Sequence, residues 1–70
     1  MTTLRYDVPT EERAGILAAR LMAVGYPGTM VAKRTESATY RISVPDIDEA
    51  RSGEVQALVK RLEPMANPVF

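Results

Sequence analysis

Three residue types that carry much of protein chemistry are missing from this chain of 70 residues: cysteine, histidine and tryptophan. Without cysteine no disulfide can form, and without cysteine and histidine the usual zinc, iron and copper sites lose their main ligands. These two residues are also the side chains that most readily serve as acid, base or nucleophile near neutral pH. The sequence therefore predicts a protein that is not an enzyme, with no catalytic residue, no metal and no cofactor.

Net charge and long apolar runs are lacking as well. Nine basic and nine acidic residues cancel, so the chain has no overall field that would attract nucleic acid or anionic lipid. Its apolar runs fall far short of the roughly 20 residues that cross a membrane, and no signal pattern opens it. We expect a cytoplasmic protein with no membrane contact. Residues 1–70 suffice for a single small domain, whose limited core would benefit from self-association.

The clearest element is a helix over residues 10–25. Thr10 can cap its start, Glu11 and Glu12 oppose the positive end of its dipole, and Gly25 can end it in a left-handed conformation. An apolar stripe at a spacing of three and four residues predicts that one side of this helix covers a sheet. The stripe consists of Ala14, Leu17, Ala18, Leu21 and Val24.

Alternation of apolar and polar residues predicts three strands. Residues 3–8 form a half-buried strand with Tyr6 on its inner face, and residues 29–44 form a hairpin whose arms meet near Glu36 and Ser37. This loop places Val31 opposite Ile42 and separates apolar from polar residues well. A three-residue loop would shift the register by one residue.

The segment after the hairpin repeats the chemistry of the first strand-to-helix junction. A strand that ends at Val44, a proline at 45 and a capping oxygen at Asp46 predict a second helix. Because its apolar pattern is clean only after residues 52 and 53, we expect a short first turn, a break and a main helix over 52–63. Residues 65–70 are either a loose tail or a last strand, which Pro68 would restrict to a sheet edge.

The predicted order is therefore strand, helix, strand, strand, helix and a short C-terminal edge strand. Two strand-to-helix junctions separated by a hairpin resemble the small ferredoxin-like, or split βαβ, topology of α+β proteins. In that arrangement two helices cover one face of an antiparallel sheet. Many unrelated functions use this fold, so the resemblance implies an architecture and no activity.

One flank of the first helix, away from its core stripe, is a candidate helix interface. Small and apolar residues there would let another helix approach closely. Either the second helix of the same domain or a second copy of the protein would fit. The flank consists of Gly15, Ile16, Ala19 and Ala23.

The outer sheet face is a candidate surface for an anionic partner. The predicted topology brings Arg5 next to Arg41, with Arg34 on the neighbouring strand and Lys33 beside it, and guanidinium groups bind phosphates and carboxylates well. RNA-binding sheets of this kind also need outward aromatic residues to stack bases, whereas Tyr6 and Tyr40 are predicted to face inward. A solvated, charge-balanced face explains the same residues.

These observations favour a small protein-interaction or regulatory module that forms a homodimer or binds another protein. The alternatives are nucleic-acid binding through the arginines and, by fold analogy alone, a domain that senses small molecules. The sequence identifies neither the partner nor the biological process.

Overall fold

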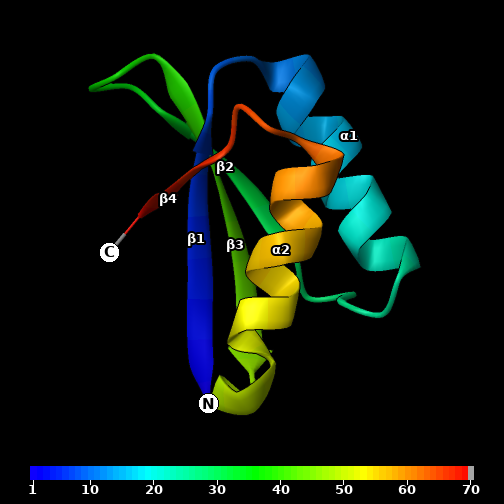
Figure 1. The fold of residues 1–70 in the computed structure, drawn as a ribbon. Helices are drawn as coiled ribbons and strands as arrows, with labels where there is room; N and C mark the ends of the chain where they lie inside the picture. Colours follow the sequence, from blue (N-terminus) through cyan, green and yellow to red (C-terminus); the bar gives the residue numbers. More distant parts are fainter. Residues whose placement is uncertain (70) are drawn as a thin grey trace.

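Residues 1–69 are described by a computed structural model, and the predicted C-terminal strand, which extends to residue 70, lies in part outside that range. Four strands form one sheet in the order β2-β3-β1-β4, and every neighbouring pair is antiparallel. Both helices lie on the same side of this sheet, which confirms the α+β architecture (Figure 1). The elements are β1 (Thr2–Val8), α1 (Glu11–Ala23), β2 (Met30–Arg34), β3 (Thr39–Ile47), the short 3₁₀ helix η1 (Glu49–Arg51), α2 (Ser52–Leu62) and β4 (Asn67–Val69).

The first helix begins as its sequence predicts. The Thr10 side-chain oxygen accepts a hydrogen bond from the Arg13 backbone N–H at 3.2 Å, and Gly25 ends the helix with φ at 116°. Four residues of the predicted stripe are buried, whereas Val24 is 56% exposed, so its placement in the core was wrong. Val24 has left helical geometry, with ψ at 8°, and the helical spacing no longer directs its side chain toward the sheet.

The hairpin has the predicted register. Val31 lies opposite Ile42, Lys33 opposite Tyr40 and Arg34 opposite Thr39. The connection between the two strands comprises residues 35–38, and Ala38 adopts a positive φ of 54°. The alternation of apolar and polar residues was therefore sufficient to define the pairing.

The junction between β3 and the second helix differs from the prediction. β3 does not end at Val44 but continues through Pro45 to Ile47, past an irregularity in its pairing with β1. Asp46 takes a φ of 59° there, so it cannot cap the helix, and Asp48 does so by accepting a hydrogen bond from the Ala50 N–H at 3.0 Å. A β-bulge accommodates a proline inside a strand because one residue leaves the ladder. The predicted short turn followed by a main helix is confirmed by η1 and α2.

The hydrophobic core fills the space between the sheet and the two helices. Tyr6 is 3% exposed and Tyr40 packs against the same cluster, so both tyrosines face inward as predicted. The C-terminal edge strand is also confirmed, because β4 pairs with residues 5–7 of β1. Within residues 1–69 no helix is long and apolar enough to cross a membrane.

Candidate functional site

The predicted arginine face contains a carboxylate at its centre. Asp7 lies directly opposite Arg41 across β1 and β3, and its oxygens accept hydrogen bonds from Arg41 at 2.9 and 3.3 Å and from Arg34 at 3.4 Å. Arg34 also forms an ion pair with Glu36 at 3.0 Å. Arg5, in turn, lies opposite Ser43, two positions along the ladder from Arg41, and is therefore not directly opposite it. Two of the three arginines thus have carboxylate partners within the chain.

The pKa values reflect these contacts. The hydrogen bond from Arg41 is the main cause that lowers the pKa of Asp7 below 3.8, and burial opposes the shift. The same contact raises the pKa of Arg41. Lys33 shares the helix-covered face with its partner Tyr40, so the structure does not bring it together with the arginines. The charges of the open face are therefore largely compensated by one another.

The predicted helix interface is solvent-exposed along its whole length. Gly15, Ala19 and Ala23 are exposed, Ile16 is 50% exposed, and a Cβ atom added at Gly15 would meet nothing within 4 Å. The second helix of the domain does not cover this flank, which removes one of the two occupants considered from the sequence. Met22 at 45% exposure extends the same apolar surface.

The position of α2 explains why the flank is free. Arg13 reaches Glu63, just past the end of α2, with its Nη1 at 2.9 Å from Oε1, so this side of α1 faces α2. Gly15 follows Arg13 by two positions, or about 200° round the helix, and therefore lies on the side away from α2. Ile16, at about 300°, lies closer to Arg13 and points away from the sheet. Since α1 packs across β2 and β3, that free side lies toward the β2 edge of the sheet.

Strand β2 adds exposed apolar residues at the edge of the sheet beside this flank, with Val31 on the helix-covered face and Met30 and Ala32 on the open face. It is an outer strand with one neighbour, and Met30 and Val31 are 61% and 43% exposed. Ala32 and Lys33 are exposed as well. We call the combined area the β2–α1 surface; it comprises Gly15, Ile16, Ala19, Met22, Ala23, Met30, Val31 and Ala32.

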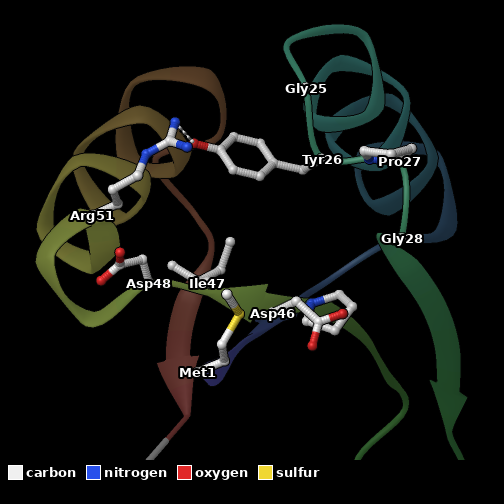
Figure 2. A pocket seen from close by; sticks show the side chains of 10 residues that line it. Met1, Gly25, Tyr26, Pro27, Gly28, Asp46, Ile47, Asp48 and Arg51 are labelled. Atoms are coloured by element: carbon white, nitrogen blue, oxygen red, sulfur yellow. Dashed lines mark hydrogen bonds between the residues drawn. The ribbon is translucent and has the colours of Figure 1, made fainter.

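A separate hollow of about 490 Å³ opens beyond the end of β3 (Figure 2). Arg51 donates a hydrogen bond from Nη2 to the Tyr26 hydroxyl at 3.0 Å, and its guanidinium lies 5.7 Å from the centroid of the Tyr26 ring. This pair joins the loop after α1 to η1. Asp46 and Asp48 also line the hollow, so it presents both signs of charge beside an aromatic ring.

Gly28, on the rim of the same hollow, is constrained by its neighbour. A Cβ atom there would lie 3.2 Å from Cγ of Pro45, closer than most such contacts. The absence of a side chain at this position keeps the loop against β3. Sequence reasoning missed the Tyr26–Arg51 pair, because residues 25 positions apart carry no local signal of contact.

Sequence reasoning also missed the buried carboxylate of Glu63, which is only 7% exposed. Besides its ion pair with Arg13, it accepts a hydrogen bond from the Met65 N–H at 3.1 Å and so fixes the turn that leads into β4. A signal was present, since Glu63 follows Val59 by four positions on the apolar side of α2.

Two comparisons with known proteins were made. No family model matches the chain, and no curated protein sequence is similar to it.

Proposed function

We propose that this protein is a non-enzymatic interaction module that self-associates through the β2–α1 surface. The observation that carries the proposal is the exposure of Met30 and Val31 on an unpaired edge strand next to an uncovered apolar helix flank. Exposed apolar side chains gathered at one edge of a small domain are typical of contact sites between proteins. The unpaired backbone N–H and C=O groups of an outer strand add a directional element, because they can accept another strand.

The chemistry of the chain supports a role in binding rather than catalysis. Cysteine and histidine are absent, and the carboxyl of Asp7 has a pKa that is lowered rather than moved toward neutrality. A general acid or base works best when its pKa lies near the working pH. Asp7 is instead engaged by two guanidinium groups on the open face.

Self-association is tested by light scattering coupled to size-exclusion chromatography at micromolar concentration. We expect the mass of a dimer, and dissociation when Val31 is replaced by lysine, because a second cation then stands beside Lys33 on the exposed edge. The matched control is Ser37→Lys in the exposed hairpin loop, which adds the same charge outside the surface. A strict monomer for the unmodified chain would contradict the proposal.

A second candidate function, small-molecule sensing, is favoured by the hollow beside Tyr26 and Arg51. Its volume lies in the range of about 300–1,000 Å³ usual for ligand sites, although it is open and formed mainly by exposed residues. A thermal-shift screen of small carboxylates and amines tests it. Stabilisation that disappears in Arg51→Ala and persists in Lys60→Ala would support sensing, and a flat screen would count against it.

Nucleic-acid binding through Arg5, Arg34 and Arg41 has weaker support, because Asp7 and Glu36 already occupy two of these side chains. Phosphate contacts would have to replace ion pairs that exist within the chain. Binding to mixed single-stranded and duplex oligonucleotides at low salt, with a steep loss as salt rises, would favour this alternative.

A further inference from the structure

We propose that β2 of one copy pairs antiparallel with β2 of a second copy. The two copies are related by a two-fold axis, perpendicular to the sheet, that passes midway between Val31 and its copy. The proposal rests on the self-association inferred above and specifies its geometry. It joins two four-stranded sheets into one continuous sheet of eight strands. All the helices then lie on the same face of this sheet, because an axis perpendicular to the sheet preserves its faces.

The side chains of β2 favour this register over those with the axis at Ala32 or Lys33. Residues that lie opposite each other in an antiparallel pair have their side chains on the same face of the sheet. Since this axis preserves the faces, one residue of the strand must lie opposite its own copy, and that residue defines the register. With the axis at Val31, Val31 opposes its own copy, Met30 opposes Ala32, and Lys33 opposes Thr29. With the axis at Ala32, Val31 would oppose Lys33 and Met30 would oppose Arg34. An axis at Lys33 would place two ammonium groups opposite each other, which is destabilising.

The helix flank agrees with the same axis. Because α1 packs across β2 and β3, the two-fold brings α1 and its copy side by side in opposite directions. Gly15 and Ala19 carry little or no side chain, and a Cβ atom at Gly15 would meet nothing within the free chain, so two backbones can come close there. A second copy is therefore an occupant that fits both the strand and the helix.

Charge complementarity also favours a second copy as the occupant. Lys33 of each copy reaches the segment after the other α1, where the C-terminal end of a helix attracts cations. The chain has no net charge, so two copies do not repel each other as whole molecules.

Single cysteines provide a direct test, because the chain has none of its own. In the proposed register the two Val31→Cys residues face each other within reach of a disulfide. The two Ala32→Cys residues are offset from each other by two positions along the strands, so their Cα atoms lie too far apart. Cα atoms more than about 7 Å apart cannot be bridged by a disulfide without backbone movement. Under mild oxidation we expect Val31→Cys to form a covalent dimer at least tenfold faster than Ala32→Cys. Lys60→Cys on α2 is the control, and its rate of cross-linking measures disulfide formation by random collision.

The outcomes separate the geometry from the self-association itself. A dimer by light scattering in which Ala32→Cys cross-links faster than Val31→Cys overturns the register and leaves self-association standing. A dimer in which neither cross-links faster than Lys60→Cys overturns the pairing of β2 with its copy about Val31. A monomer at every concentration removes both proposals.

A second variant tests the helix contact without relying on the strand. Gly15→Leu adds a large side chain where the free chain has open space, so the monomer should fold and melt normally. We expect its dimer dissociation constant to rise at least tenfold. Lys60→Leu is the matched control on α2, and an unchanged dissociation constant for Gly15→Leu would overturn the close approach of the two helices.

Discussion

The two outer strands of the sheet are built very differently. β4 is three residues long, contains Pro68 and follows a turn that Glu63 fixes through its hydrogen bond with Met65 while it forms a part-buried ion pair with Arg13. β2 is five residues long, contains no proline, and exposes Met30, Val31 and Ala32. A short strand with proline cannot extend a sheet, whereas a longer apolar strand can. The difference indicates that this domain protects one edge of its sheet and leaves the other available.

The largest effect is expected in the core on which both edges depend. Leu21 is fully buried in α1, so Leu21→Asp places a carboxylate without a partner among apolar side chains. We expect a loss of about 4 kcal/mol or more in the free energy of unfolding, which unfolds a domain of this size. Circular dichroism during urea titration measures it. A cooperative transition near that of the unmodified protein would show that Leu21 does not lie in the core.

A smaller effect is expected at the protected edge. Arg13→Ala leaves the carboxylate of Glu63 without its ion-pair partner, and the turn before β4 depends on that carboxylate. We expect a loss of about 1–3 kcal/mol, as for other charged groups left unpaired at a buried site. Arg61→Ala, on the exposed side of α2, is the control and should change stability by at most about 0.5 kcal/mol. Equal losses in both variants would contradict the role of Glu63.

A weaker and pH-dependent effect is expected on the open face, where Asp7 links β1 to Arg41 on β3 and Arg34 on β2. Arg41→Ala should destabilise the protein only slightly at neutral pH, because the pair is partly exposed. The pKa of Asp7 is lowered in the folded state, so its contribution is complete above 3.8 and disappears as the pH falls through the lower folded-state value.

The difference between Arg41→Ala and the unmodified protein should therefore shrink on acidification below pH 3.8. Urea titrations at neutral and at low pH measure this change. Arg5→Ala, whose position lies opposite Ser43, is the control and should show no such dependence. A difference that grows toward low pH would mean that Arg41 does not stabilise the ionised carboxylate.

The smallest effect, with the opposite sign, is expected under the protected edge. Tyr6 lies opposite Pro68 of β4, and its buried hydroxyl has no hydrogen-bond partner within residues 1–69. Burial also raises its pKa. Tyr6→Phe removes an unsatisfied polar group, so we expect stability to stay level or rise by up to about 1 kcal/mol. Tyr40→Phe is the comparison, and a clear loss confined to Tyr6→Phe would indicate that a buried water binds the hydroxyl.

Much of this architecture could be predicted from the sequence because its signals are local. The hairpin register follows from the alternation between residues 29 and 44, and the break before α2 follows from the interrupted apolar pattern. The extension of β3 to Ile47 could not be predicted in this way. It depends on pairing with β1, which is distant in the sequence, and on the positive φ of Asp46.

The candidate surface was only partly predictable, for a similar reason. Helical spacing identified the apolar flank at Gly15 and Ala19, but not which helix would cover it. Whether the flank is covered depends on the position of α2 relative to α1. The long-range contact between Arg13 and Glu63 shows that α2 lies on the other side of α1. The arrangement of charges on the arginine face differs from the prediction. Arg5 was expected next to Arg41, but Asp7 lies opposite Arg41.

The central place of β1 has a consequence for how the chain reaches this state. Residues 5–7 pair with residues 67–69, so the two ends of the chain meet in neighbouring strands. The β2–β3 hairpin and α1 can form from nearby residues as the chain leaves the ribosome, but the partner of β1 on this side is translated later than all of them. During synthesis β1 therefore presents an unpaired edge until residues 67–69 have emerged and β4 covers it.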